Sequence, residues 1–152
     1  MDLWTVMKMR RSVRKFAPVQ PPDSAVEKLL DAAKLAPSAG GLESRRIFVV
    51  KPPTKRRDLA TACYDQSFVG EAPFALVFCA DLSKIEPYGD RGRDLYCIQD
   101  VSASVENVLL RAVDLGLAGC WVGAFDEIKV KELLGLPDNL RPLAIVPIGY
   151  EG

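Results

Sequence analysis

The chain has 152 residues, 49% of them hydrophobic, with 20 basic and 20 acidic side chains and no histidine. This length predicts one domain spanning residues 1–152, and the missing histidine excludes Ser-His-Asp, Cys-His and imidazole-ligated metal sites, so a cofactor must supply any difficult chemistry. The four cysteines are scattered and no apolar run is long enough to cross a bilayer, which predicts a cytoplasmic protein with reduced thiols, no metal site and no membrane segment.

The first 35 residues contain two helical patterns joined by a proline-rich connector. Residues 2–9 predict a short opening helix, because apolar side chains fall on one face. Ser24 and Glu27 have the spacing of a capping box, which predicts that a second helix opens here and ends near Leu35.

Two strands and a polar helix are expected next. The run 46–50 is short, β-branched and followed by prolines, which predicts a strand, and a polar helix is expected over 54–64. Residues 72–80 are almost continuously apolar, which predicts a central strand buried on both faces. Residues 84–92 are expected to form a loop.

A long amphipathic pattern follows over residues 93–116, where apolar side chains recur every three or four positions without an interior Gly or Pro. About 20 helical residues span about 30 Å, so this helix must be central or lie against a partner. We expect it to form a homodimer contact through its apolar stripe, which includes Val105. The remaining expected elements are a strand over 118–122, a helix capped by Asp126 and running to Leu134, and a strand over 141–150.

Two early segments suit a phosphate-bearing ligand. Arg10, Arg11 and Arg14 surround Ser12, and guanidinium and hydroxyl groups bind phosphate oxygens. Residues 37–41 form a turn of small residues that lets the backbone approach a planar ligand. From the residues alone, the first segment also fits a solvated basic helix end, and the second fits an ordinary turn after a helix.

These segments, together with the sequence Gly-Cys-Trp-Val-Gly-Ala-Phe-Asp at 119–126, resemble the nitroreductase family of FMN-dependent oxidoreductases, in the same order along the whole chain. The resemblance implies an α+β fold, with a mixed central sheet flanked by helices and a long central helix at a homodimer interface. It also implies hydride transfer from NAD(P)H through bound FMN to a small organic acceptor, such as a nitroaromatic or a quinone, by a ping-pong mechanism.

The resemblance assigns no catalytic side chain, since the flavin carries the chemistry. In place of the family's Asn and Gln-Pro-Trp, this chain has Gly41 and Glu43-Ser44-Arg45, and many relatives continue past the position of Gly152 as an arm around the partner. The implied cofactor-binding residues are Arg10, Arg11, Ser12 and Arg14 at the phosphate and ribityl chain, Pro37, Ser38, Ala39 and Gly40 reaching in from the second subunit, Gln66 as a weaker flavin contact, and the backbone amides of Gly123 and Ala124 at the flavin N5 edge.

Two other functions fit the same scaffold: a flavin-binding module with little turnover, and a flavin-cleaving or dehalogenating relative. Nucleic acid is not an expected partner. Residues 1–57 carry 13 basic and 5 acidic side chains, but no RNA-binding or helix-turn-helix pattern accompanies them.

Overall fold

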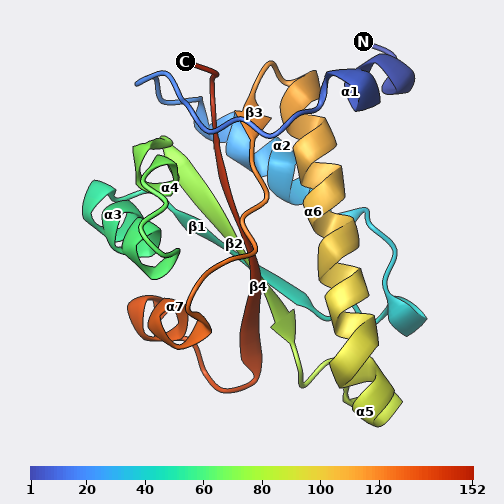
Figure 1. The fold of residues 1–152 in the computed structure, drawn as a ribbon. Helices are drawn as coiled ribbons and strands as arrows, with labels where there is room; N and C mark the ends of the chain where they lie inside the picture. The colour runs from blue at the N-terminus through green and yellow to red at the C-terminus, as the bar shows by residue number, and fades with distance from the viewer.

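The computed structural model describes residues 1–152, and its core is a four-stranded sheet in the order β1-β2-β4-β3 (Figure 1). All neighbouring strands pair antiparallel, and the parallel component of the expected mixed sheet is an isolated bridge between Ser12 and Gly119. The expected α+β fold is confirmed. The strands are β1 (Arg45–Val50), β2 (Phe74–Asp81), β3 (Ala118–Gly119) and β4 (Leu140–Gly149).

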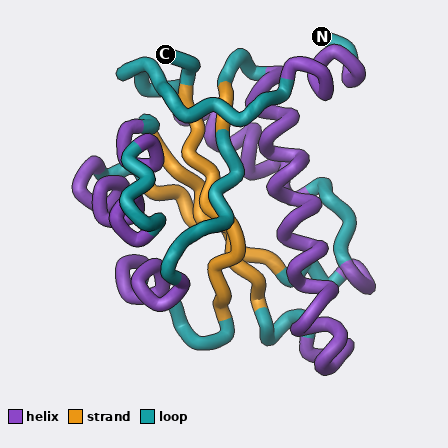
Figure 2. Tube along the Cα trace, in the orientation of Figure 1, coloured by secondary structure: helices purple, strands orange, loops and turns teal.

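Helices cover both faces of the sheet (Figures 1 and 2). Helices α2 and α6 pack on one face, and α3, α4 and α7 pack on the other. None of the helices has the length and apolar character that a membrane crossing requires. The helices are α1 (Leu3–Met9), α2 (Asp23–Lys34), α3 (Pro53–Ala62), α4 (Phe68–Glu71), α5 (Gly89–Arg91), α6 (Cys97–Asp114) and α7 (Glu127–Leu134).

The central strand β2 is buried along its whole length, as its apolar run predicts. Successive side chains of a strand point to opposite faces, and here Leu76 and Phe78 join the core under α2 and α6. Ala75 and Val77 join the second core, under α3, α4 and α7. The continuous apolar run is therefore explained by two hydrophobic cores that share one strand.

Two local expectations are wrong. The predicted capping box does not form, because α2 begins at Asp23 after Pro22, so Ser24 lies inside the first turn and no side chain caps the helix. The stretch 84–92 is not a plain loop, since a short 3₁₀ turn and α5 occupy it and lead through a π-helical turn into α6. By contrast, the predicted cap of α7 is confirmed, because the Asp126 carboxylate accepts from the second and third residues beyond it.

Helix α6 is as long and central as its pattern predicts, but its apolar stripe is covered within one chain. Val105 and Val108 are fully buried in the core formed with α2 and the sheet. The expectation that Val105 lies at a contact between chains is therefore wrong. A helix pattern reports which face is buried, and it cannot tell an intrachain neighbour from a second subunit.

Candidate functional site

The arginine segment runs in extended form across the ends of β3 and β4. Val13 N donates to Gly119 O at 3.0 Å, which places the segment beside β3. Gly152 N donates to Lys15 O at 2.9 Å, so the last residues of the chain pair with the same segment. This pairing joins positions more than a hundred residues apart, and no local sequence pattern predicts it.

The side chains of this segment that are suited to bind phosphate differ in whether they already have a partner within the chain. The side chains of Arg10, Ser12 and Arg14 make no hydrogen bond or ion pair with the rest of the chain. Arg11 instead pairs with Glu151, and this contact raises the pKa of Arg11 and lowers the pKa of Glu151. Two guanidinium groups and a hydroxyl therefore remain available to an anion.

The loop after β3 presents free backbone amides. Val122 still pairs with the sheet, donating to Ile145 O at 2.8 Å, and the exposed amides of Gly123 and Ala124 then have no acceptor. Gln66 Nε2 donates to Ala124 O at 3.0 Å, and this hydrogen bond restrains the loop. The free N–H groups suit an electron-rich acceptor atom at the edge of a ligand.

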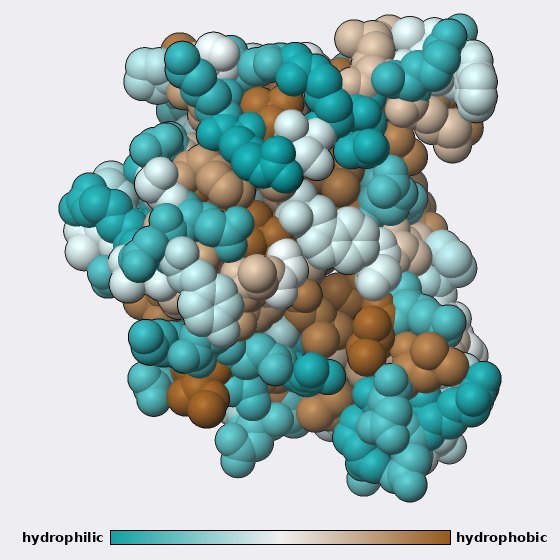
Figure 3. Space-filling model, viewed as in Figure 1, coloured by the Kyte–Doolittle hydropathy of each residue, from teal (hydrophilic) through white to brown (hydrophobic).

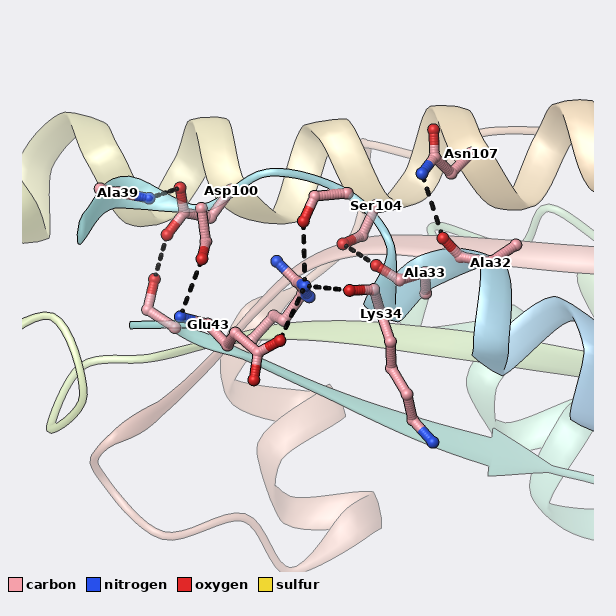
Figure 4. A network of polar contacts seen from close by, with 12 residues as sticks. Ala32, Ala33, Lys34, Ala39, Glu43, Asp100, Ser104 and Asn107 are labelled. Carbon is pink, nitrogen blue, oxygen red and sulfur yellow. Dashed lines mark hydrogen bonds and ion pairs between the residues drawn. The ribbon is translucent and has the colours of Figure 1, made fainter. Parts of the chain in front are cut away.

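The Pro37–Gly41 turn is held against the N-terminal part of α6 (Figure 4). The buried Asp100 carboxylate accepts from Ala39 N at 2.9 Å and from Ser44 Oγ at 2.8 Å. Gly40 and Gly41 have φ of 58° and 67°, which is the left-handed region that glycine adopts without a steric cost. The small residues of the turn are thus required by its backbone as well as by any ligand.

The same network reinforces the C-terminal end of α2, where the Ala32 and Ala33 carbonyl groups already accept from the backbone N–H groups of Leu35 and Ala36. From α6, Ser104 Oγ donates to Ala33 O at 2.9 Å and Asn107 Nδ2 donates to Ala32 O at 3.1 Å (Figure 4). The Arg45 guanidinium donates to Lys34 O at 3.0 Å and is almost fully buried. The departure from the family pattern at Arg45 therefore has a structural role.

Sequence reasoning missed this network, although a signal for it exists. Asp100, Ser104 and Asn107 stand four and three positions apart, so they form a polar stripe along α6 beside its apolar one. A buried polar stripe requires hydrogen-bond partners on a neighbouring element, and the end of α2 together with the turn provides them.

The two candidate ligand-binding segments lie at opposite ends of α6 in a single chain. The turn is fixed at Asp100, whereas the arginine segment lies with Val113 and Leu117 around a cavity of about 210 Å³ at the other end of α6. From Asp100 to Asp114, fourteen steps of 1.5 Å along α6 amount to about 21 Å. The two segments of one chain are therefore separated by most of the length of α6.

Burial keeps two of the four cysteines in the thiol form. All four are free and buried. Burial raises the pKa of Cys63 and of Cys79 to about 12, so these thiols stay protonated near neutral pH.

Comparisons with known proteins agree with this architecture. The family model described as "Nitroreductase family" matches residues 7–69 and 62–150. An Archaeoglobus fulgidus protein provisionally named NADH dehydrogenase/NAD(P)H nitroreductase is 37% identical over 147 residues, which cover 93% of this chain and 80% of the relative.

Two solved structures are similar along nearly the whole chain. A nitroreductase family protein from Clostridium novyi NT is 30% identical with a TM-score of 0.91, covering 100% of this chain and 86% of the other. An FMN-dependent nitroreductase from Clostridium difficile R20291 is 29% identical with a TM-score of 0.84, covering 96% of this chain and 86% of the other.

Proposed function

Since the chain belongs to the nitroreductase family, we propose that it is an FMN-dependent oxidoreductase that transfers a hydride from NAD(P)H through bound FMN to a small organic acceptor. The observation that carries the proposal is the set of unengaged donors in one region of the fold: Arg10, Ser12 and Arg14 beside β3, and the free amides of Gly123 and Ala124 a few residues further along.

The chemistry of these donors fits the parts of FMN. A phosphate dianion is bound best by guanidinium forks and hydroxyl groups, which Arg10, Arg14 and Ser12 supply. The backbone amides of Gly123 and Ala124 are suited to the edge of the isoalloxazine ring, where negative charge increases on reduction. When bound, FMN supplies the hydride acceptor and donor that no side chain of this protein provides.

We also propose a homodimer, because the Pro37–Gly41 turn and the arginine segment of one chain lie at opposite ends of α6, so that a turn from a second chain would complete the site. An exposed apolar surface is available for that contact, since Leu3, Trp4 and Leu35 are 63%, 67% and 82% exposed. Leu3 and Leu35 line one groove of about 340 Å³ that also reaches α6. In Figure 3, apolar atoms are visible at α1 and over the lower half of α6, and surfaces of this kind mark contacts between proteins.

The proposed kinetic route is ping-pong. Gly123 and Ala124 would occupy one edge of the flavin and the partner's turn another, which leaves one open face for NAD(P)H and the acceptor in turn. Two substrates that share one face cannot be bound together. We propose the cytoplasm as the compartment, because four free thiols fit reducing surroundings.

Titration with FMN tests the proposal most simply. Quenching of flavin fluorescence should accompany binding, and Arg14→Ala should weaken binding by about 1.5–3 kcal/mol, the range for hydrogen bonds to charged groups. Arg57→Ala is the matched control, since Arg57 is an exposed arginine on α3. NADH oxidation with a quinone should then give parallel double-reciprocal plots. Absence of quenching at high micromolar FMN would overturn the proposal, and bound FMN without turnover would favour a flavin-binding module.

A further inference from the structure

A tyrosine hydroxyl lies directly against the Pro37–Gly41 turn. A Cβ atom built on Gly40 would overlap the Tyr88 hydroxyl and come within 3.1 Å of two further atoms of the same ring. Tyr88 is 42% exposed and its hydroxyl forms no hydrogen bond within the chain. The residue is therefore at the edge of the turn, with an uncommitted donor.

Tyr88 belongs to a small cluster that also contains Tyr96 and Arg91. The two tyrosine rings meet edge to face, with centroids 5.3 Å apart and an interplanar angle of 81°. The Arg91 guanidinium lies 5.5 Å from the Tyr96 ring centroid, and Arg91 Nε donates to the Tyr96 hydroxyl at 3.1 Å. These contacts fix the orientation of both the rings and the cation.

The positive charge of Arg91 is not neutralised by the chain. No carboxylate lies within ion-pair distance of Arg91, whereas its neighbour Arg93 pairs with Asp90 and has Asp94 at 3.8 Å. The terminal N–H groups of Arg91 remain unused, because its one hydrogen bond is made by Nε. The cluster therefore combines an exposed aromatic ring, a free hydroxyl and a free guanidinium fork.

We propose that Tyr88, Arg91 and Tyr96 form a specificity site for an aromatic ring that carries an acidic substituent. The inference rests on the proposed function, because it places this ligand beside the FMN that the turn would contact. An aromatic ring packs on the tyrosines, and a carboxylate or phosphate group accepts the two parallel N–H bonds of the guanidinium. Two sources share this chemistry: an acid-bearing aromatic acceptor, and the adenosine 2′-phosphate of NADPH.

Equilibrium binding to the FMN-loaded protein separates the two sources. Calorimetric titrations would use benzoate and 2′-AMP as acidic probes, and benzamide and adenosine as their neutral counterparts. Arg91→Met should weaken binding of the acidic probe by about tenfold or more, which is the effect of losing a hydrogen bond between charged groups. Binding of its neutral counterpart should be unchanged. Arg93→Met is the matched control and should change neither, since Arg93 is already paired.

A second variant tests the aromatic part of the site. Tyr88→Ala should weaken the acidic and neutral probes alike, because it removes the ring that both would contact. If Arg91→Met weakens the binding of benzoate, the site is assigned to the acceptor. If it weakens the binding of 2′-AMP, the site is assigned to the nucleotide. Equal binding of acidic and neutral probes, or unchanged binding after Arg91→Met, overturns the inference. Steady-state NADH oxidation with a neutral quinone, measured on the same preparations, tests the proposed function separately.

Discussion

The carboxylate of Asp100 is expected to be the single most important polar group for the position of the Pro37–Gly41 turn. Asp100→Ala removes the acceptor of two hydrogen bonds, at 2.9 Å from Ala39 N and at 2.8 Å from Ser44 Oγ. Ser44 is fully buried, so its hydroxyl would lose its partner without access to water. Leaving a buried donor without an acceptor costs about 1–3 kcal/mol, and losing the hydrogen bond of the half-buried Ala39 amide costs about 0.5–1.5 kcal/mol.

The expected loss of unfolding free energy is therefore about 2–4 kcal/mol, which corresponds to roughly 5–15 °C in Tm for a chain of this length. Urea unfolding followed by circular dichroism measures it. Ser102→Ala is the matched control, because Ser102 Oγ bonds only to Ile98 O within the same helix. If Asp100→Ala destabilises no more than Ser102→Ala, the turn is not held by this carboxylate and the reasoning fails.

Three further predictions concern the backbone, an acid and the thiols. Gly40→Ala should destabilise the protein more than Gly41→Ala. Both variants lose about 1–2 kcal/mol of unfolding free energy because of the positive φ, but only the Cβ at position 40 meets a tyrosine hydroxyl. Equal losses of unfolding free energy in urea titrations would contradict this. Burial raises the pKa of Asp81, but hydrogen bonds from Ser83 and Asn139 outweigh this and hold the pKa below its usual value. The contribution of Asp81 to the unfolding free energy should therefore be present at neutral pH and be lost as the pH falls through the folded-state pKa. Asp81→Asn should flatten this acid-side dependence of the unfolding free energy. Cys63 and Cys79, with pKa values raised to about 12 by burial, should resist alkylation at pH 8 until urea unfolds the chain, and rapid labelling of the native protein would refute the burial.

The sheet and its helices could be predicted because their signals are local. The apolar run of β2, the period of α6 and the Asp126 cap each reflect the environment of a few neighbouring residues. The start of α2 could not be read correctly, because Pro22 fixes the entry of the helix and the Ser24 spacing was misleading. A sequence pattern for a cap is only one of several ways to begin a helix.

The arrangement of the candidate site depended on contacts that no local pattern encodes. The pairing of Arg11 with Glu151 joins the two ends of the chain, and Asp100 joins α6 to a turn 61 residues earlier. The resemblance to the family indicated the candidate cofactor-binding residues, and the structure shows which of their side chains have no partner within the chain. Arg10 and Arg14 are unpaired, whereas Arg11 is already paired with a carboxylate.

Whether one FMN site is built from two chains is tested most directly by mixing two defective variants. Arg14→Glu disables the arginine segment, and Gly41→Trp obstructs the turn at a position where a Cβ meets nothing within 4 Å of its own chain. Each variant alone should bind no FMN. After subunits are mixed by unfolding and refolding, random pairing gives about half heterodimers, each with one intact site, so about a quarter of all sites should bind FMN if the segments come from different chains. No recovery of FMN binding on mixing, with heterodimers demonstrated by mass spectrometry, would contradict the two-chain site.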